Sequence, residues 1–183
     1  FGATWADGKP SSGAYPIPQP VKLDLDKARE YMKAAGMPDG FSTTFSFNVG
    51  QASTAEPMSA LIKESLAKIG IKVDIQKLPD AQMSTQINEK KLPFFTEGIV
   101  AWLPSTDYFY RNFYTGNQRW NYSSINNPEL AEIAQGARFE PDKAKYEEAG
   151  RKLNAMHADL MPQIMLWQPN QDAVMAPSIE GYT

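Results

Sequence analysis

The feature of this sequence that most constrains the fold is a change of hydrophobic period between residues 41 and 76. Over residues 41–48, phenylalanine or threonine alternates with small polar residues, which is the period of two expected of a half-buried β-strand. Residues 58–69 then place apolar side chains at helical spacing, and residues 71–76 alternate again. A strand, an amphipathic helix and a second strand form a βαβ unit, so we expect the two strands to be parallel.

Residues that begin and end helices mark the other segments. Asp24 can cap a helix that ends at Gly36, and Ser53 followed by Glu56 forms a capping box for the helix of the βαβ unit. Proline at the first helical position predicts a further helix from residue 128. The remaining expected elements are helices over 81–89 and from about 141 to 161, a central strand over 94–102, and strands over 163–168 and 172–175. Together they predict one α/β domain built on a mixed sheet flanked by helices.

The composition excludes several classes of function. The formal charge of −3, from 18 basic and 21 acidic side chains, argues against nucleic acid as a partner, because phosphate contacts need a clustered basic surface. The absence of cysteine from the sequence excludes disulfides, iron–sulfur clusters, thiolate zinc sites and a cysteine nucleophile. We therefore expect neither a cysteine-dependent site nor a nucleic-acid-binding protein.

Few residues suggest catalysis. His157, the single histidine, lies in the middle of a predicted helix, where we expect a surface or edge residue, and one imidazole with Met161 does not make a metal site. Glu97 and Asp107 could form the carboxylate pair of a carbohydrate-acting hydrolase, and this stays open as an alternative. The sequence carries no phosphate-binding or metalloprotease motif. We expect no catalytic residue, no cofactor and no metal.

Aromatic residues gather in one part of the chain. Eight of the 21 fall between Trp102 and Tyr122, beyond the predicted third strand, and ligands of open α/β sheets bind beyond the carboxyl ends of the strands. Residues 102–108 supply rigid π surface, two hydroxyls and one carboxylate, the mixture typical of ligand sites. Residues 109, 113 and 114 follow helical spacing and are expected in the core. Trp102 and Tyr108 are expected to face a ligand or partner, and either interpretation is open for Trp120 and Tyr122.

Five motifs in a fixed order resemble the extracellular solute-binding proteins of ABC importers, in the family 5 class that includes peptide-, nickel- and opine-binding members. The residues that carry the resemblance are 26–29 with 35–36 and 38–41, 66–73, Trp102 with Asp107, 121–122 with 126–129, and 162–164 with 180–182.

The resemblance implies a fold and a context. In that family two α/β lobes of a type II-like periplasmic binding protein close on the solute, and these motifs belong to the C-terminal lobe. Residues 24–183 are then one ligand-binding lobe, residues 1–23 are an extended proline-rich connector, and the N-terminal lobe of the same protein is a missing partner. The other partners implied are a solute and a membrane permease. The implied location is the periplasm, or the cell exterior with a lipid anchor in a Gram-positive source.

The resemblance also implies a ligand site. Trp102 and Tyr108 wall the solute, Ser105 and Thr106 hydrogen-bond it, Asp107 or Arg111 contacts it or braces the loop, and Tyr122 completes the set.

The class of solute follows from a departure from the family pattern. In peptide-binding members an acidic residue binds the ligand's α-amino group three positions after the tryptophan, and here that position is Ser105. The expected solute is therefore a peptide, an opine, a sugar or a similar polar molecule. Besides the hydrolase, a second alternative is an interaction module whose aromatic patch docks another protein.

Overall fold

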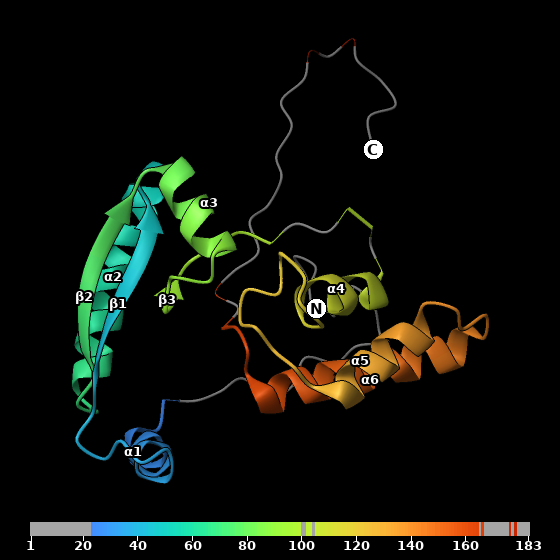
Figure 1. Ribbon diagram of the computed structural model, residues 1–183, viewed down its shortest axis with the longest axis horizontal. Helices are drawn as coiled ribbons and strands as arrows, with labels where there is room; N and C mark the ends of the chain where they lie inside the picture. Colours follow the sequence, from blue (N-terminus) through green and yellow to red (C-terminus); the bar gives the residue numbers. More distant parts are fainter. Residues whose placement is uncertain are drawn as a thin grey trace.

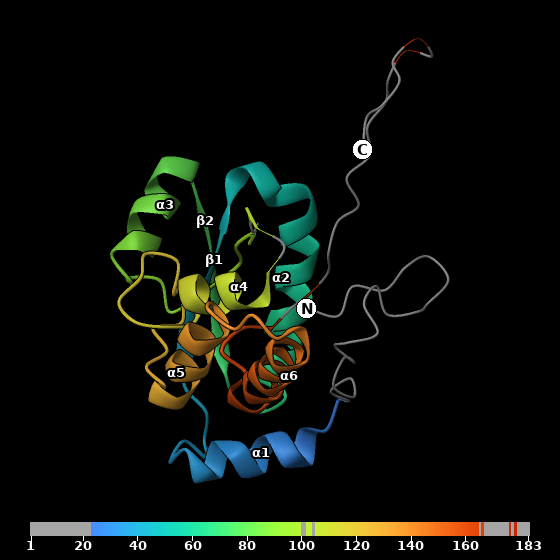
Figure 2. The same cartoon turned by 90° about the vertical axis from the view of Figure 1, so that its right-hand side faces the viewer.

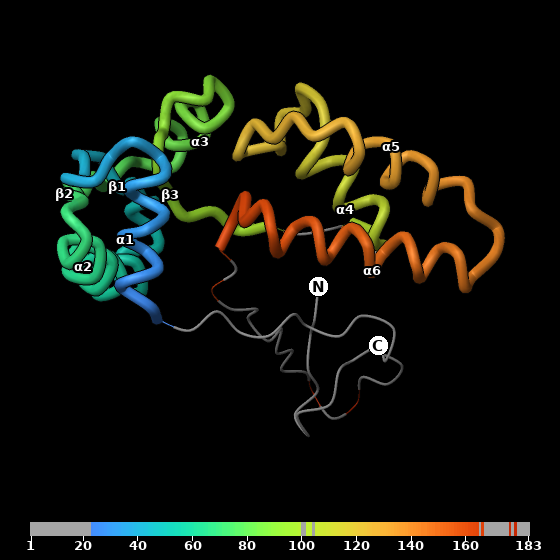
Figure 3. Tube along the Cα trace, turned by 90° about the horizontal axis from the view of Figure 1, so that it is seen from below, coloured from blue at the N-terminus to red at the C-terminus, as the bar shows by residue number. Residues whose placement is uncertain are grey.

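The computed structural model describes residues 23–99, 102–103, 105–164, 166, 176 and 178 of the 183-residue chain. Its elements form two groups that lie side by side, a sheet with its helices and a set of three helices (Figures 1 and 3). The first group contains α1 (Leu25–Ala34), β1 (Ser42–Asn48), η1 (Val49–Gln51), α2 (Ala52–Ala67), β2 (Lys72–Leu78), α3 (Asp80–Asn88) and β3 (Phe94–Phe95). The second contains α4 (Thr106–Phe113), α5 (Pro128–Ala137) and α6 (Lys143–Leu160).

The sheet has the order β2-β1-β3, and both strand pairs are parallel. The register pairs Phe45 with Ile75 on one side and with Phe94 on the other. The expected parallel βαβ unit and the α/β class, with a sheet flanked by helices, are confirmed, while the sheet of the described strands is parallel where the sequence predicted a mixed one.

Opposite faces of the sheet are covered by different helices, α2 and α3, as Figure 2 shows. Phe45, Phe47 and Val73 form a buried cluster on the α2 side. Leu78 packs with Met83 and other side chains of α3 on the opposite side. Because β1 lies between two strands and helices cover both faces of the sheet, the polar residue Ser46 is fully buried, although Ser42 at the start of the strand is exposed.

Of the described residues in the strand predicted over 94–102, only Phe94 and Phe95 are in a strand, and its predicted central position is wrong among the described strands. The strand ends at Phe95 and forms the edge of the sheet, while residues 96–99 belong to no strand and residues 100–101 lie outside the described residues. The Gly98 N–H group is bound at 3.0 Å by the carboxylate of Glu97, which gives it a local acceptor in place of a strand carbonyl.

Side-chain caps mark the starts of three of the six described α-helices, at Asp24, Asn127 and Asp142. Asp24 and Asn127 accept hydrogen bonds from the backbone N–H groups of Lys27 and Leu130, at 2.9 and 3.0 Å. The capping box of Ser53 and Glu56 is a wrong prediction. The 3₁₀ turn η1, held by the carbonyl oxygen of the Asn48 side chain on the Gly50 N–H at 2.7 Å, leads directly into α2 and places Ser53 inside the helix.

The three helices of the second group pack around a separate core. Its buried members come from all three helices and the residues that follow α4: Tyr110, Phe113, Tyr114, Leu130, Ala134 and Leu153. The expectation that residues 109, 113 and 114 contribute to the core is confirmed, since Phe109 packs against this cluster and the other two belong to it.

The two groups are joined through the segment that precedes α5. The ammonium group of Lys90, just after α3, donates to the backbone carbonyl of Asn121, and the guanidinium of Arg119 donates to the side chain of Asn88 at 3.1 Å. The ring of Tyr122 packs edge-on against Phe95 with 6.0 Å between ring centroids. These contacts fix the second group against the α3 side of the sheet.

Several predicted segments lie outside the described residues. They include residues 1–22 of the predicted connector, residues 172–175 and the motif at 180–182. Of the strand expected over 163–168, the described residues 163, 164 and 166 are not in a strand. Among the helices of the described residues, none has the length and apolar character needed to cross a membrane.

Candidate functional site

The candidate site is built on the first turn of α4, where the expected ligand-binding segment becomes helical. Ser105 is the N-cap residue, with the extended backbone typical of that position, although its side chain makes no capping hydrogen bond. Asp107 lies in the first turn and Arg111 in the last, so both charges have the sign that the helix dipole favours.

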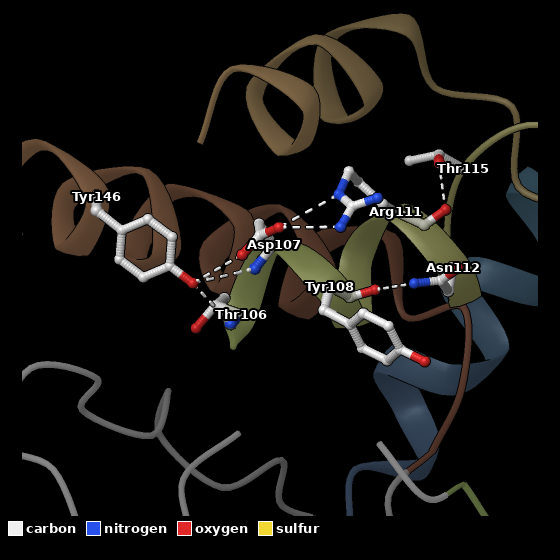
Figure 4. A network of polar contacts seen from close by, with 7 residues as sticks. All are labelled: Thr106, Asp107, Tyr108, Arg111, Asn112, Thr115 and Tyr146. Carbon is white, nitrogen blue, oxygen red and sulfur yellow. Dashed lines mark hydrogen bonds and ion pairs between the residues drawn. The ribbon is translucent and has the colours of Figure 1, made fainter. Parts of the chain in front are cut away.

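Three polar side chains form a compact network at this helix start (Figure 4). The Nε and Nη2 atoms of Arg111 each donate to Oδ2 of Asp107 at 3.2 Å. The hydroxyl of Tyr146, from α6, donates to the other carboxylate oxygen at 2.9 Å. The side chains of Asp107 and Arg111 are only 10% and 17% exposed. Because both carboxylate oxygens are engaged within the fold, the arrangement is that of a brace.

Trp102, unlike the shielded side chains of Asp107 and Arg111, is exposed. Its side chain is 81% exposed, and the neighbouring Leu103 is 54% exposed. Ser105, Thr106 and Tyr108 are half-buried beside the network. The structure therefore brings an exposed aromatic residue and three hydroxyl-bearing residues to the segment that runs into the braced end of α4.

Tyr122, the remaining residue of the expected set, contacts β3 and the last residue of α4. Its ring packs on Phe95 and Phe113, and the ammonium group of Lys90 lies 5.8 Å from its centroid. Burial, together with the negative charge of Glu97, raises the pKa of the Tyr122 phenol. These are the contacts of a ring that joins the two halves of the fold.

The carboxylates of the hydrolase alternative have different environments. Burial raises the pKa of Glu97, and the charge of Asp80 adds to this effect against the hydrogen bond from Gly98. A raised pKa suits a general acid, but the second carboxylate of the pair, Asp107, is held by Arg111 and Tyr146.

His157 lies at the edge of the helical core, one of the two positions expected from the sequence. It is half-buried, and its ring packs edge-on against Tyr114 and Tyr110 at centroid distances of 4.9 and 6.3 Å. Burial lowers its pKa. The described residues contain no cluster of three or more histidine, aspartate or glutamate side chains that could hold a metal ion.

Tyr146 is the member of the network that sequence reasoning missed as a site residue. It lies 39 residues after Asp107, on a helix whose hydrophobic spacing marks it as an inward-facing side chain and nothing more. A contact between distant segments leaves no local pattern in a single sequence.

The fold is that of the periplasmic binding proteins, and comparison with known proteins identifies the family. A profile described as bacterial extracellular solute-binding proteins, family 5 (middle part), matches residues 2–121, which is more than half of the chain. The chain therefore belongs to family 5 of the bacterial extracellular solute-binding proteins.

The relatives are binding proteins. A glutathione-binding protein, GsiB, from Salmonella choleraesuis is 40% identical over 72 residues, which make up 39% of this chain and 14% of that protein. The structure of the ABC transporter-associated periplasmic binding protein DppA from Helicobacter pylori, in complex with the peptide STSA, is 25% identical with a TM-score of 0.71. That match covers 82% of this chain and 30% of DppA.

A dipeptide-binding protein from Pseudoalteromonas, in complex with Met-Leu, shows the same fold at 21% identity, with a TM-score of 0.74. The match covers 84% of this chain and 32% of that protein. The matched regions thus span less than a third of the length of each of these three relatives.

Proposed function

We propose that this chain forms one lobe of the solute-binding component of an ABC importer, and that residues 102–111 form part of one wall of its solute site. In this proposal residues 24–183 are the lobe and residues 1–23 connect it to a second lobe, which covers the solute from the opposite side. The permease in the membrane recognises the closed form. The protein acts in the periplasm, or outside the cell on a lipid anchor.

The observation that carries the proposal is the exposure of Trp102. Burying an aromatic side chain stabilises a protein by roughly 2–3 kcal/mol, so an indole that is 81% exposed leaves most of that free energy available for a contact. Exposed tryptophans are also among the residues that dominate binding energy at recognition surfaces. The braced start of α4 would keep this side chain close to a fixed position.

The polar groups of the segment favour a particular mode of binding. Ser105, Thr106 and Tyr108 offer hydroxyls, which can donate to or accept from a polar solute. The carboxylate of Asp107 already accepts from Arg111 and Tyr146, so we do not expect it to bind a ligand ammonium group. A small peptide, an opine or a sugar can each supply the complementary groups, and lobe closure would strengthen the bonds by excluding water.

Calorimetry of the 183-residue chain tests the proposal that this lobe supplies only about half of the contacts to the solute. A complete site with a Kd near 1 μM corresponds to about 8 kcal/mol, and half of those contacts leave about 4 kcal/mol, or a Kd near 1 mM. We expect millimolar binding or no measurable heat when glutathione, dipeptides, opines or monosaccharides are added to the chain. Joining the chain to the N-terminal lobe should restore tight binding of one of these solutes. Nanomolar affinity of the chain alone would show a complete site and contradict the proposal.

A further inference from the structure

The first turn of α4 obtains its hydrogen-bond acceptor from a distant helix. The first N–H groups of a helix have no acceptor within it, and the N-cap side chain commonly supplies one. The N-cap residue Ser105 makes no such bond. The phenolic oxygen of Tyr146 lies instead 3.0 Å from the backbone nitrogen of Thr106, and 3.5 Å from that of Asp107. The shorter of these is a well-formed hydrogen bond, and the longer one is weak.

The same hydroxyl is also a donor. Its proton is directed to Oδ1 of Asp107 at 2.9 Å, while Oδ2 of that carboxylate accepts from Arg111. Burial raises the pKa of Tyr146, so the phenol keeps this proton at neutral pH. One oxygen atom therefore holds both the backbone and the acidic side chain of the first turn.

The contact matters because the hydroxyl comes from a different helix. Tyr146 belongs to α6, which runs for 18 residues and packs with α4 and α5 around their shared core. A tyrosine ring has few rotatable bonds, so its hydroxyl transmits the position of the helix that carries it. The hydroxyl thus holds the start of α4 in a fixed position relative to α6. Trp102 lies three residues before the N-cap Ser105.

We propose that Tyr146 is a positioning residue for the solute-binding segment: its hydroxyl fixes the first turn of α4 and thereby the location of Trp102 and Ser105. The inference rests on the proposed function, because it assigns a purpose to the segment that Tyr146 holds. Tyr146 itself is not expected to contact the solute.

The test uses the 183-residue chain and the variant Tyr146→Phe, which removes the hydroxyl and keeps the ring. Amide hydrogen exchange and the indole N–H signal of Trp102 are followed by nuclear magnetic resonance. Losing a net hydrogen bond of about 1.4 kcal/mol corresponds to about tenfold faster exchange of the Thr106 amide. We also expect the Trp102 indole signal to shift or broaden.

Tyr110→Phe is the matched control, because the Tyr110 hydroxyl also links α4 to α6, through a 2.9 Å hydrogen bond to Asn154, but not at the helix start. It should leave the Thr106 amide and the Trp102 indole unchanged. A second variant, Thr106→Pro, removes the donor at a position where helices accept proline, and should alter the Trp102 signal as Tyr146→Phe does.

Two results would overturn the inference: a folded Tyr146→Phe chain with unchanged exchange at Thr106 and an unchanged Trp102 signal, or equal effects in Tyr110→Phe. These measurements need no solute. A failure of the two-lobed protein to bind any solute would therefore overturn the proposed function, and would leave the action of Tyr146 on the helix start standing as a separate result.

Discussion

The carboxylate of Asp107 accepts two N–H groups from Arg111, one helical turn away, each at 3.2 Å, in a setting where both side chains are largely shielded from water. An ion pair of this kind has already lost much of its hydration, and the attraction between its members offsets that loss only while both are present. The pair therefore stabilises the helix start and leaves little capacity for a further charged partner.

Asp107→Asn should destabilise the chain. The hydrolase alternative predicts instead that this substitution abolishes a hydrolytic activity. The substitution leaves the Arg111 charge poorly compensated, and we expect the free energy of unfolding to fall by about 2–4 kcal/mol. Urea denaturation measures this. Lys143→Met is the control, because Lys143 pairs with Glu147 at 3.8 Å with its own side chain 89% exposed, and its loss should cost under about 0.5 kcal/mol. Equal effects of the two substitutions, or a hydrolytic activity that disappears in Asp107→Asn, would contradict this view of the pair.

Asn121→Ala should be among the most destabilising substitutions outside the apolar core. The Asn121 side chain is 1% exposed, donates to the carbonyls of Gly116 and Ile125 at 2.9 and 2.8 Å, and accepts from the Ile125 N–H at 3.1 Å. Three hydrogen bonds at about 1 kcal/mol each predict a loss of about 3 kcal/mol.

The matched control for that substitution is Asn126→Ala, at an exposed position five residues further along the same segment. It should change the free energy of unfolding by less than about 0.5 kcal/mol. A loss below about 1 kcal/mol in Asn121→Ala would show that the segment before α5 does not depend on this side chain.

We expect His157 to contribute to the pH dependence of the free energy of unfolding. Burial lowers its pKa in the folded chain, so the unfolded chain binds the proton more readily. This contribution to stability is present above the ordinary histidine pKa of 6.5 and is lost as the pH falls below it towards the folded value. As the pH is lowered from about 7.5 to about 5.5, the unfolding free energy of the parent chain should therefore fall relative to that of His157→Asn. A difference that stays constant across this range would show that the ring is not shielded from water.

The parts of the fold that the sequence predicts are those governed by local period and by caps. The alternation around Phe45 and the helical spacing before Gly70 predict the βαβ unit, and the Asn127 cap predicts α5. The length of β3 was not predictable, because the apolar run after Phe95 satisfies a strand pattern while the Gly98 N–H group finds an acceptor in a neighbouring carboxylate.

The candidate site divides in the same way. The segment from Trp102 to Arg111 stands out in the sequence through its aromatic residues and its resemblance to a family motif. The role of Asp107 depends on Tyr146, some 39 residues distant, and only the packing of α6 beside α4 brings the two together. Local sequence therefore identifies which segment to examine, while the tertiary structure shows which of its groups are already engaged.

Hydroxyl-radical footprinting of Trp102 tests the account most directly, with Phe139 as the internal reference because it is 75% exposed and lies just after α5, outside the proposed solute wall. The oxidation rates of the two side chains are compared in the 183-residue chain and in a two-lobed protein that contains it, mixed with glutathione, dipeptides, opines and monosaccharides. The account predicts that oxidation of Trp102, relative to Phe139, falls severalfold in the two-lobed protein. An unchanged ratio would mean that nothing covers the indole, and would contradict the assignment of this face to the solute site.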